Sequence, residues 1–339
     1  MGTQIDVAPE KILEVKDLNT RFNTEDCTIF AVNGVSFELR KSELLSIVGE
    51  SGSGKSVTVK SILGLIPTPP GQITSGSAQF EGKDLLTLKE EEIRQVRGQQ
   101  IGFIFQDPMT SLNPVLPIGK QITEPMETHL GLSSAQAKEK AIHILNLIGF
   151  PKAASRLNDY PHQFSGGMRQ RVMIAIALSC NPKILIADEP TTALDVTIQA
   201  QIIDVIKDLR NEFDMSIIWI THDLGVVAGI ADRVLVMYGG CVVEQAPVRE
   251  VYANPLHPYT QGLLGSLPKL GKKNRDRLVN IKGQPPTITR EVTCCPFSPR
   301  CPYAFDKCQL TNPALLPTGP SHEVACWWDI ERGEPRIGI

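Results

Sequence analysis

The chain has 339 residues, enough for one large domain or two of ordinary size. Its 34 lysines and arginines against 37 aspartates and glutamates give a net charge of -3, which excludes an overall basic field that would attract nucleic acid or an anionic membrane surface. No apolar run approaches the roughly 20 residues needed to span a bilayer, and the N-terminus lacks the basic and apolar regions of a secretory signal. We therefore expect a cytosolic protein.

Short apolar runs alternate with helical patterns along the chain. Residues 44–49 form an apolar run that ends in glycine, and a helical pattern follows over 55–65, which predicts a strand, a tight turn and a helix. These runs are too apolar for half-solvated strands, which favours an α/β fold whose parallel sheet is covered on both faces. Further buried strands are expected at 101–106, 183–188, 216–221 and 232–240.

Two segments depart from this alternation. Between 107 and 180 the pattern is helical, so we expect an α-helical lobe inserted between two core strands. Beyond about Pro268, a short basic run is followed by eight prolines between Pro285 and Pro320, which indicates a separate, loop-rich unit. The expected organisation is a large domain over 1–267 and a small extension over 268–339.

The motif GESGSGKS at 49–56 carries the first recognisable chemistry. It follows a predicted strand and precedes a predicted helix, where successive backbone N–H groups can wrap a β-phosphate. Lys55 would then reach the β- and γ-phosphate oxygens, and the Ser56 hydroxyl would coordinate Mg²⁺. Gly52 and Gly54 leave room for phosphate and tolerate a positive φ. The alternative is a chance turn rich in glycine and serine, which the correct flanking elements disfavour.

The run ILIADE at 184–189 delivers two carboxylates at the end of a buried strand, the edge where ligands of open α/β sheets collect. Asp188 is expected to hold Mg²⁺ through its water shell, and Glu189 to polarise the attacking water. A strand end followed by two solvated acids is the ordinary alternative. The presence of Lys55 upstream favours the phosphate chemistry.

A second loop of anion-binding type lies in FSGGMRQRV, residues 164–172. Ser165, Gly166 and Gly167 precede a predicted helix that starts at about Met168, and the N-terminal dipole of such a helix favours an anion. Because the loop at 49–56 already binds the phosphates of one nucleotide, a second phosphate-binding loop is needed only if it contacts a different nucleotide. The alternative is a glycine pair that merely lets a helix pack closely.

Six motifs in the same order make residues 11–265 resemble the ATP-binding subunits of ABC transporters. The resemblance implies an ABC-type, RecA-like P-loop NTPase core with an N-terminal antiparallel β-subdomain and a helical subdomain at about 107–180. The signature departs slightly from the family, with Phe164 where leucine is commonest and Met168 where glutamine is commonest. The matching motifs are Gly49 to Ser56, Gln106, FSGGMRQR, ILIADE, TALD at 192–195 and THD around His222.

The same resemblance implies roles for individual residues. Two such domains would pair head to tail, so that the signature from Ser165 to Met168 covers the γ-phosphate held by the partner's loop. Gln106 would contact Mg²⁺ and the attacking water, His222 would contact the γ-phosphate, and Asp195 would belong to the loop that crosses the dimer seam. The expected Mg²⁺ contacts are Ser56, Gln106 and Asp188. The expected ATP-binding run is Gly49, Glu50, Ser51, Gly52, Ser53, Gly54, Lys55, Ser56 and Val57.

The adenine ring is expected to stack on Phe22. Phe30, which also precedes the first core strands, is the alternative, and an aromatic residue at either place can simply be part of a core.

Four further segments resemble the di- and oligopeptide importer subfamily: 105–122, 254–268, 281–288 and the cysteine-rich tail. They imply an ATPase of the D type, which pairs with a different, F-type ATPase beneath two integral membrane permease subunits. An extracytoplasmic binding protein would deliver di- or oligopeptides, and the chain would lie at the cytoplasmic face of the membrane.

Two alternatives to peptide import stay open. The same ATPase role is found in importers of nickel chelates and other solutes. A soluble ABC ATPase acting on nucleic acid or ribosomes is a function of another class, which a single cassette with a short helical insert disfavours. We expect no nucleic-acid partner.

Eight cysteines divide into two groups. Cys27, Cys180 and Cys241 lie in cassette regions and are expected to be inert. The other five lie in the tail, where a reducing cytosol disfavours disulfides and a metal is the better interpretation. The tail has no C-x-x-C knuckle of the zinc-ribbon kind, and longer gaps suit an iron–sulfur cluster.

The peptide-importer tail resembles one that carries a [4Fe-4S] cluster. The expected ligands are Cys295, Cys301, Cys308 and Cys326, with Cys294 spare. Zinc and free thiols stay open, and so does a tail that acts as a regulatory module shutting off the ATPase.

Overall fold

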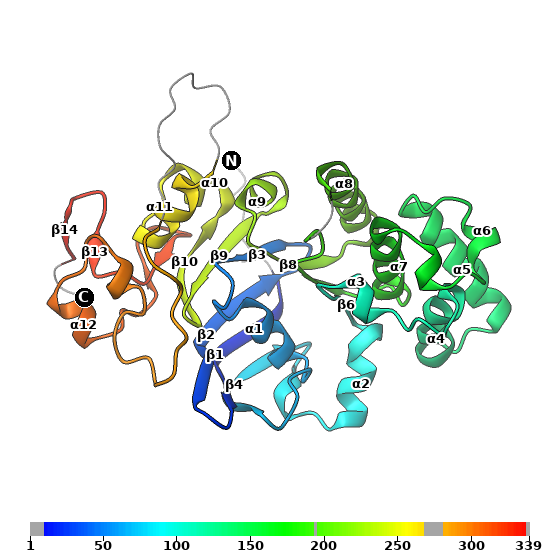
Figure 1. The fold of residues 1–339 in the computed structure, drawn as a ribbon, viewed down its shortest axis with the longest axis horizontal. Helices are drawn as coiled ribbons and strands as arrows, with labels where there is room; N and C mark the ends of the chain where they lie inside the picture. The colour runs from blue at the N-terminus through cyan, green and yellow to red at the C-terminus, as the bar shows by residue number, and fades with distance from the viewer. Residues whose placement is uncertain (1–9, 193–194, 268–280, 337–339) are drawn as a thin grey trace, which may run out of the picture. The chain divides into compact units, whose positions relative to one another are not determined.

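The computed structural model describes residues 10–192, 195–267 and 281–336 (Figure 1). The chain forms two compact units, each assembled from segments that are distant in sequence. The first unit comprises Met1–Val15, Phe37–Glu43 and Ala78–Ile218, and the second comprises Lys16–Ser36, Leu44–Ser77 and Trp219–Ile339.

The first unit has two parallel strands at its centre. Strand β6 (Ile101–Ile104) pairs with β7 (Ile184–Asp188), with Ile104 opposite Ala187. A parallel pair needs a crossover connection, and here that crossover is helical, as the sequence predicts for 107–180. The helices of the unit are α2 (Glu90–Gln99), α3 (Pro108–Ser111), α4 (Ile118–Leu130), α5 (Ser134–Leu147), α6 (Ala153–Arg156), α7 (Gly166–Leu178) and α8 (Val196–Phe213), with short 3-10 turns at Leu85–Thr87 and Pro161–Gln163.

Sequence signals explain where the crossover helices begin and which face they bury. Helix α5 starts after Ser133, whose hydroxyl accepts a hydrogen bond from Gln136 N at 3.4 Å in a capping box. The buried residues of α4 include Ile118, Ile122 and Met126, which are spaced four apart and form one apolar stripe. This stripe packs within the helical lobe, where α4 contacts α5 and α7.

The second unit contains a sheet whose strands run in the order β11, β12, β10, β9, β3. Strand β3 (Leu44–Val48) is parallel to β9 (Arg233–Tyr238), and every residue of both is buried, as expected for strands covered on both faces. On the other side of β9, each strand is antiparallel to the one before it: β10 (Cys241–Pro247) to β9, β12 (Glu323–Val324) to β10, and β11 (Leu316–Pro317) to β12. The helices are α1 (Lys55–Ile62), α9 (Leu224–Ile230), α10 (Val248–Ala253), α11 (Pro258–Gly265) and α12 (Asp306–Leu310), and Trp328–Asp329 (β13) pairs with Glu334–Pro335 (β14).

Four strands contain a boundary between the two units, so that part of each strand belongs to each unit. They are β1 (Lys11–Asn23), β2 (Thr28–Arg40), β4 (Gly71–Phe80) and β8 (Ser216–Thr221). The first three belong to a four-stranded sheet in the order β2, β1, β4, β5, where β5 is Lys83–Asp84 and pairs antiparallel with β4. This sheet is the N-terminal β-subdomain that the family resemblance implies.

The C-terminal extension belongs to the second unit. Its described part, 281–336, is mostly loops and short elements, and β12 pairs with β10 through Glu244 opposite Val324. The proposed boundary at 267/268 stays a prediction because 268–280 lie outside the described residues. Within the described part of the chain, no helix combines the length and the apolar character that crossing a membrane requires.

Candidate functional site

The loop 49–54 joins the end of β3 to the start of α1, as the sequence predicts. Gly54 lies at a φ of +98°, and a Cβ atom there would approach Ala31 O to 2.4 Å, so only glycine fits. Gly52 also has a positive φ, but a Cβ there would meet nothing within 4 Å. The loop is therefore closely packed at its helical end and open at its middle.

Lys55 is held inside this loop. Its Nζ donates hydrogen bonds to Gly49 O at 2.8 Å and to Glu50 O at 3.0 Å, and the residue is only 4% exposed. Helix α1 has no side-chain cap at Gly54, so a bound anion can take the place that a capping side chain would fill. Ser53 Oγ is buried with no hydrogen-bond partner among the described residues, as expected for a polar atom of a ligand-binding loop.

In the first unit, Gln106 and Glu189 lie together. Gln106 lies two residues after Ile104, and Glu189 lies two residues after Ala187, which is paired with Ile104. Parallel pairing therefore places both residues at the same carboxyl edge. Gln106 Nε2 donates a 3.1 Å hydrogen bond to Glu189 Oε2, and Thr192 Oγ1 donates a second one to the same oxygen at 3.0 Å.

The backbone of Glu189 is unusual. Its φ is +48°, which is rare for a residue with a Cβ and is found where surrounding structure fixes a functional side chain. The neighbouring Asp188 ends β7 and is fully buried. The run ILIADE thus delivers one enclosed carboxylate and one that is hydrogen-bonded to Gln106.

The second glycine loop stands at the start of α7. Ser165 is the N-cap residue, and its hydroxyl accepts a hydrogen bond from Met168 N at 3.4 Å. A Cβ on Gly167 would come within 2.9 Å of Ile198 Cγ2, so close packing against α8 accounts for this glycine. A Cβ on Gly166 would meet nothing within 4 Å, so packing does not account for that one.

Two further candidate residues lie at element ends. Asp195 is the N-cap of α8 and accepts a hydrogen bond from Ile198 N at 3.0 Å, while Ala193 and Leu194 of the same motif lie outside the described residues. His222 is exposed and follows the last residue of β8. Asp195 and the pair Gln106 and Glu189 belong to the first unit, and His222 and the loop 49–54 to the second.

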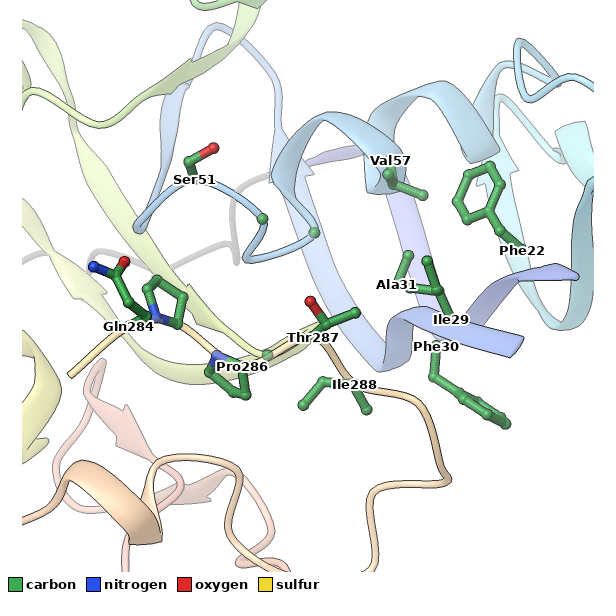
Figure 2. Close-up of a pocket in the computed structure, with 14 residues that line it drawn as sticks. Phe22, Ile29, Phe30, Ala31, Ser51, Val57, Gln284, Pro286, Thr287 and Ile288 are labelled. Atoms are coloured by element: carbon green, nitrogen blue, oxygen red, sulfur yellow. The ribbon is translucent and has the colours of Figure 1, made fainter. Parts of the chain in front are cut away.

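A pocket of about 500 Å³ in the second unit adjoins the glycine loop (Figure 2). Both aromatic candidates, Phe22 and Phe30, line it, together with Ser51 and Val57. In Figure 2 the ring of Phe30 points away from the glycine loop.

One wall of this pocket comes from the C-terminal extension, in the segment Gln284–Ile288. The sequence of 281–288 resembles that of the peptide-importer subfamily, but the resemblance does not place this segment at the site. The segment lies more than 200 residues beyond the glycine loop, so no local pattern relates the two. The resemblance is therefore the only sequence signal that could have drawn attention to it.

None of the tail cysteines forms a disulfide within the described residues. Burial raises the pKa of Cys295 to about 12, and the neighbouring thiols of Cys308 and Cys301 add to the rise. Burial likewise raises the pKa of Cys326 to about 12, with Cys295 and Cys301 among the contributing neighbours. Cys295 N donates a 2.9 Å hydrogen bond to Cys308 O, so these two expected ligands lie close together. Within the described ranges, no three His, Cys, Asp or Glu side chains are grouped closely enough to hold a metal ion.

Comparison with known proteins identifies the family. The family described as ABC transporter matches residues 32–192, and the family described as oligopeptide/dipeptide transporter, C-terminal region, matches residues 243–308. The oligopeptide transport ATP-binding protein OppD of Bacillus subtilis is 53% identical over 317 residues, which cover 94% of this chain and 88% of that protein. The dipeptide transport ATP-binding protein DppD of the same organism is 49% identical over 328 residues, covering 97% and 98%.

Solved structures agree in fold. The dimeric post-hydrolysis structure of the ATP-binding cassette MJ0796 bound to ADP and Pi has a TM-score of 0.63 and 28% identity, and it covers 70% of this chain and 99% of that one. A second similar structure is cbiO1 from Clostridium perfringens, part of the ABC transporter complex cbiONQ, with a TM-score of 0.61, 28% identity and coverage of 72% and 92%. The chain therefore belongs to the ABC transporter family, among the ATP-binding subunits that carry the oligopeptide/dipeptide transporter C-terminal region.

Proposed function

We propose that this ATPase powers the import of di- or oligopeptides through a membrane complex. The observation that carries this proposal is the identity of about half of all residues, over nearly the whole chain, to proteins named for oligopeptide and dipeptide transport. The match includes the C-terminal region as well as the cassette.

The phosphate groups of ATP would be bound by the loop 49–54 and the start of α1. Lys55 would exchange its two loop carbonyls for β- and γ-phosphate oxygens, because a phosphate is a stronger partner for an ammonium group than a neutral carbonyl. The Ser56 hydroxyl, Asp188 and Gln106 are oxygen donors of the kind that Mg²⁺ prefers. When bound, Mg²⁺ would neutralise charge between the β- and γ-phosphates.

Glu189 would polarise the attacking water. The hydrogen bonds from Gln106 and Thr192 to Oε2 hold its carboxylate oriented, as a group that polarises water requires. His222 would contact the γ-phosphate, and its exposed position after β8 is compatible with a ligand contact. Phe22 is the favoured partner for adenine, because it lines the pocket and the Phe30 ring points away from the glycine loop.

The signature would act on ATP held by a second cassette. Ser165 caps α7, and the open space at Gly166 permits a phosphate to approach the helix start. Val196 is 82% exposed directly after Asp195, as a residue that meets a partner chain would be. The companion would be an F-type ATPase subunit, so that the pair is a heterodimer.

The permease subunits would dock on the first unit, near Gln106. Three large apolar side chains are exposed there within eleven residues: Phe105 at 41%, Met109 at 63% and Val115 at 74%. Exposed apolar residues in such density favour contact with another protein. The chain would then lie on the cytoplasmic side of the membrane, and the peptide would pass through the permeases from an extracytoplasmic binding protein without touching this subunit.

The cysteine group is compatible with a [4Fe-4S] cluster. Each iron of such a cluster takes one thiolate, so four thiols can be neighbours without three of them meeting at one ion. Cys295, Cys301, Cys308 and Cys326 would be the ligands, and the bound cluster would cross-link the short elements of the tail. Iron and sulfide analysis of anaerobically purified protein tests this, with Cys301→Ser expected to lose iron and the exposed Cys27→Ser expected to keep it. Stoichiometric zinc, or thiols that bind no metal, would refute the cluster.

Peptide uptake is tested by the assembled complex. Proteoliposomes containing this chain, its companion ATPase and both permeases should accumulate labelled peptide when ATP and the binding protein are present. The matched complex with Lys55→Ala should not. ATP-dependent accumulation of a nickel chelate or a sugar, but not of peptides, would instead assign another solute.

A further inference from the structure

The nucleotide pocket of the second unit has a wall that does not belong to the cassette. Residues Gln284–Ile288 of the C-terminal extension line it opposite the glycine-loop residues Ser51, Gly52 and Gly54 (Figure 2). Figure 2 shows the Thr287 side chain directed into the space between the glycine loop and β2.

Backbone contacts fix the position of this wall. Phe30 N, in β2, donates a 2.8 Å hydrogen bond to Ile288 O at one end of the segment. Upstream of the segment, Ile281 packs so closely on α11 that a Cβ on Gly262 would lie 2.6 Å from Ile281 Cγ1. The segment is thus tied down on both sides.

Arg300 joins this wall to the glycine loop. Its Nη1 and Nη2 donate to Oε2 and Oε1 of Glu50 at 2.6 and 3.1 Å, which is a two-pronged ion pair with a residue of the loop itself. The same guanidinium donates to Lys282 O at 2.9 Å and to Gly283 O at 3.1 Å, directly before the wall. The Arg300 side chain is 6% exposed and that of Glu50 25%, so the ion pair is partly shielded from solvent.

Aromatic packing supports the same connection. The ring of Phe297 contacts those of Tyr238 and Tyr259, with centroid separations of 5.1 and 5.4 Å. The hydroxyl of Tyr259 accepts a 2.7 Å hydrogen bond from Glu50 N. Glu50 is therefore held at its backbone by α11 and at its carboxylate by the extension.

We infer that the C-terminal extension completes the nucleotide site, with Gln284–Ile288 forming a wall of the base pocket and Arg300 positioning the phosphate loop through Glu50. The inference rests on the proposed function of the glycine loop as an ATP site. Arg300 is a positioning residue because it contacts the loop through Glu50 and does not line the pocket.

The two parts of the inference act on different parts of the ligand. A bulky side chain at position 287 would occupy the base pocket and leave the phosphate loop intact. Loss of the Arg300 guanidinium would free Glu50 and loosen the loop that holds the phosphates. Tripolyphosphate carries phosphates without a base, so it separates the two effects.

The experiment measures the Kd of the full chain for the Mg²⁺ complexes of ATP and of tripolyphosphate by calorimetry. Thr287→Trp should raise the Kd for ATP about tenfold or more and leave that for tripolyphosphate unchanged. Arg300→Ala should raise both by about tenfold, as expected when a charge-assisted hydrogen-bonding partner is removed. Arg300→Lys should raise both by less, because lysine keeps the charge and loses the two-pronged geometry.

Matched controls lie in the same segment. Thr289→Trp and Arg290→Ala change exposed residues of the same types two and three positions beyond Thr287, and neither lines the pocket. Both should bind ATP and tripolyphosphate like the unaltered chain. Melting temperatures measured in parallel identify any variant that fails to fold.

If Lys55→Ala abolishes ATP binding while Thr287→Trp and Arg300→Lys bind like the unaltered chain, the extension takes no part in the site and the inference fails alone. If the unaltered chain binds no ATP, the proposed function fails and the inference with it. If Arg300→Ala does not fold, Thr287→Trp and Arg300→Lys still decide the result.

Discussion

Gln106 Nε2 donates a 3.1 Å hydrogen bond to Glu189 Oε2 across the ends of two adjacent parallel strands. The residues are 83 positions apart, and the whole helical crossover from α3 to α7 separates them in the chain. A movement of the crossover that displaces Gln106 would therefore change the hydrogen bond to the carboxylate proposed to polarise water. If the permeases dock near Gln106 as proposed, this contact lies between the docking surface and the site of hydrolysis.

The carboxylate of Glu189 is expected to be essential for hydrolysis but not for binding. Glu189→Gln keeps the shape and can still accept from Gln106, but it cannot take up a proton. We predict that kcat for ATP falls by about 10²- to 10⁴-fold while the Kd for ATP changes little. Phosphate release from the assembled complex measures the first and calorimetry the second. Wild-type turnover by this variant would remove Glu189 from the mechanism.

Lys55 is expected to be needed for nucleotide binding itself. Lys55→Ala removes the buried ammonium that donates to the carbonyl oxygens of Gly49 and Glu50. We predict that the Kd for Mg²⁺-ATP rises about 100-fold, because a hydrogen bond to a charged phosphate is lost. Calorimetry measures the change, and Lys138→Ala, which alters an exposed lysine, is the control. Unchanged affinity would contradict the assignment of 49–56 as the phosphate loop.

The two signature glycines should separate stability from function. Gly167→Ala forces a Cβ to within 2.9 Å of Ile198, so the free energy of unfolding should fall by about 1 kcal/mol. Gly166→Asp meets open space, and a carboxylate is favourable in the first turn of a helix, so stability should be unchanged.

Gly166→Asp should nevertheless impair pairing with a second cassette, because its charge repels the γ-phosphate that the companion holds. Urea unfolding measures the stability of both variants, and sedimentation with the companion measures pairing. A Gly166→Asp chain that still pairs normally on addition of ATP would argue that α7 does not face a nucleotide.

A buried histidine makes stability depend on pH. Burial lowers the pKa of His257 from 6.5 to about 4, although the negative charge of Glu244 raises this pKa and so opposes part of the decrease. The unfolded chain takes up a proton below about pH 6.5 and the folded chain does not until about pH 4. The folded chain therefore keeps its full stability with respect to His257 above about pH 6.5. As the pH falls from 6.5 to 4, protonation of His257 in the unfolded chain lowers the free energy of unfolding by about 3 kcal/mol at most.

The variant His257→Asn tests this contribution. Asparagine can still accept from Tyr259 N as an N-cap, as His257 Nδ1 does at 3.1 Å, but it does not titrate. The difference in unfolding free energy between the two chains, measured in urea at pH 7.5, 5.5 and 4.5, should shift in favour of the variant as the pH falls. A difference independent of pH would show that His257 has the same pKa folded and unfolded.

The extension should be fastened to the core through Glu244. This fully buried carboxylate accepts hydrogen bonds from Leu256 N at 2.7 Å and His257 N at 3.0 Å, and it is paired with His322 Nε2 at 2.7 Å. We predict that His322→Ala lowers the free energy of unfolding by about 2 kcal/mol, because a buried partner is lost. The exposed His143→Ala should change stability by less than about 0.5 kcal/mol. Equal stability of the two variants would contradict a fastening role.

Local patterns were sufficient to predict the strands and the glycine loops. The apolar runs at 44–49 and 183–188 fall on β3 and β7, and the helical pattern over 55–65 falls on α1, because strand and helix periodicity are properties of a few neighbouring residues. The hydrogen bond between Gln106 and Glu189 follows from the rule that parallel strands end at one edge.

The position of the extension could not be predicted in this way. Arg300 and Glu50 are 250 residues apart, and neither has a local signature that marks it as a member of an ion pair. Likewise, β12 has only two residues, too few for a periodic pattern, and it exists because β10 offers an edge to pair with. The family resemblance identified 281–288 as characteristic, and only the fold places it beside the glycine loop.

The central claim is that ATP is held between this chain and a companion cassette. Sedimentation of the Glu189→Gln chain mixed with its companion ATPase subunit, with and without Mg²⁺-ATP, tests it most directly. We predict a stable pair that forms only with ATP and is lost when either Lys55→Ala or Gly166→Asp is added. Full ATP turnover by the isolated, unaltered chain, with no ATP-dependent pairing with any companion, would contradict the account.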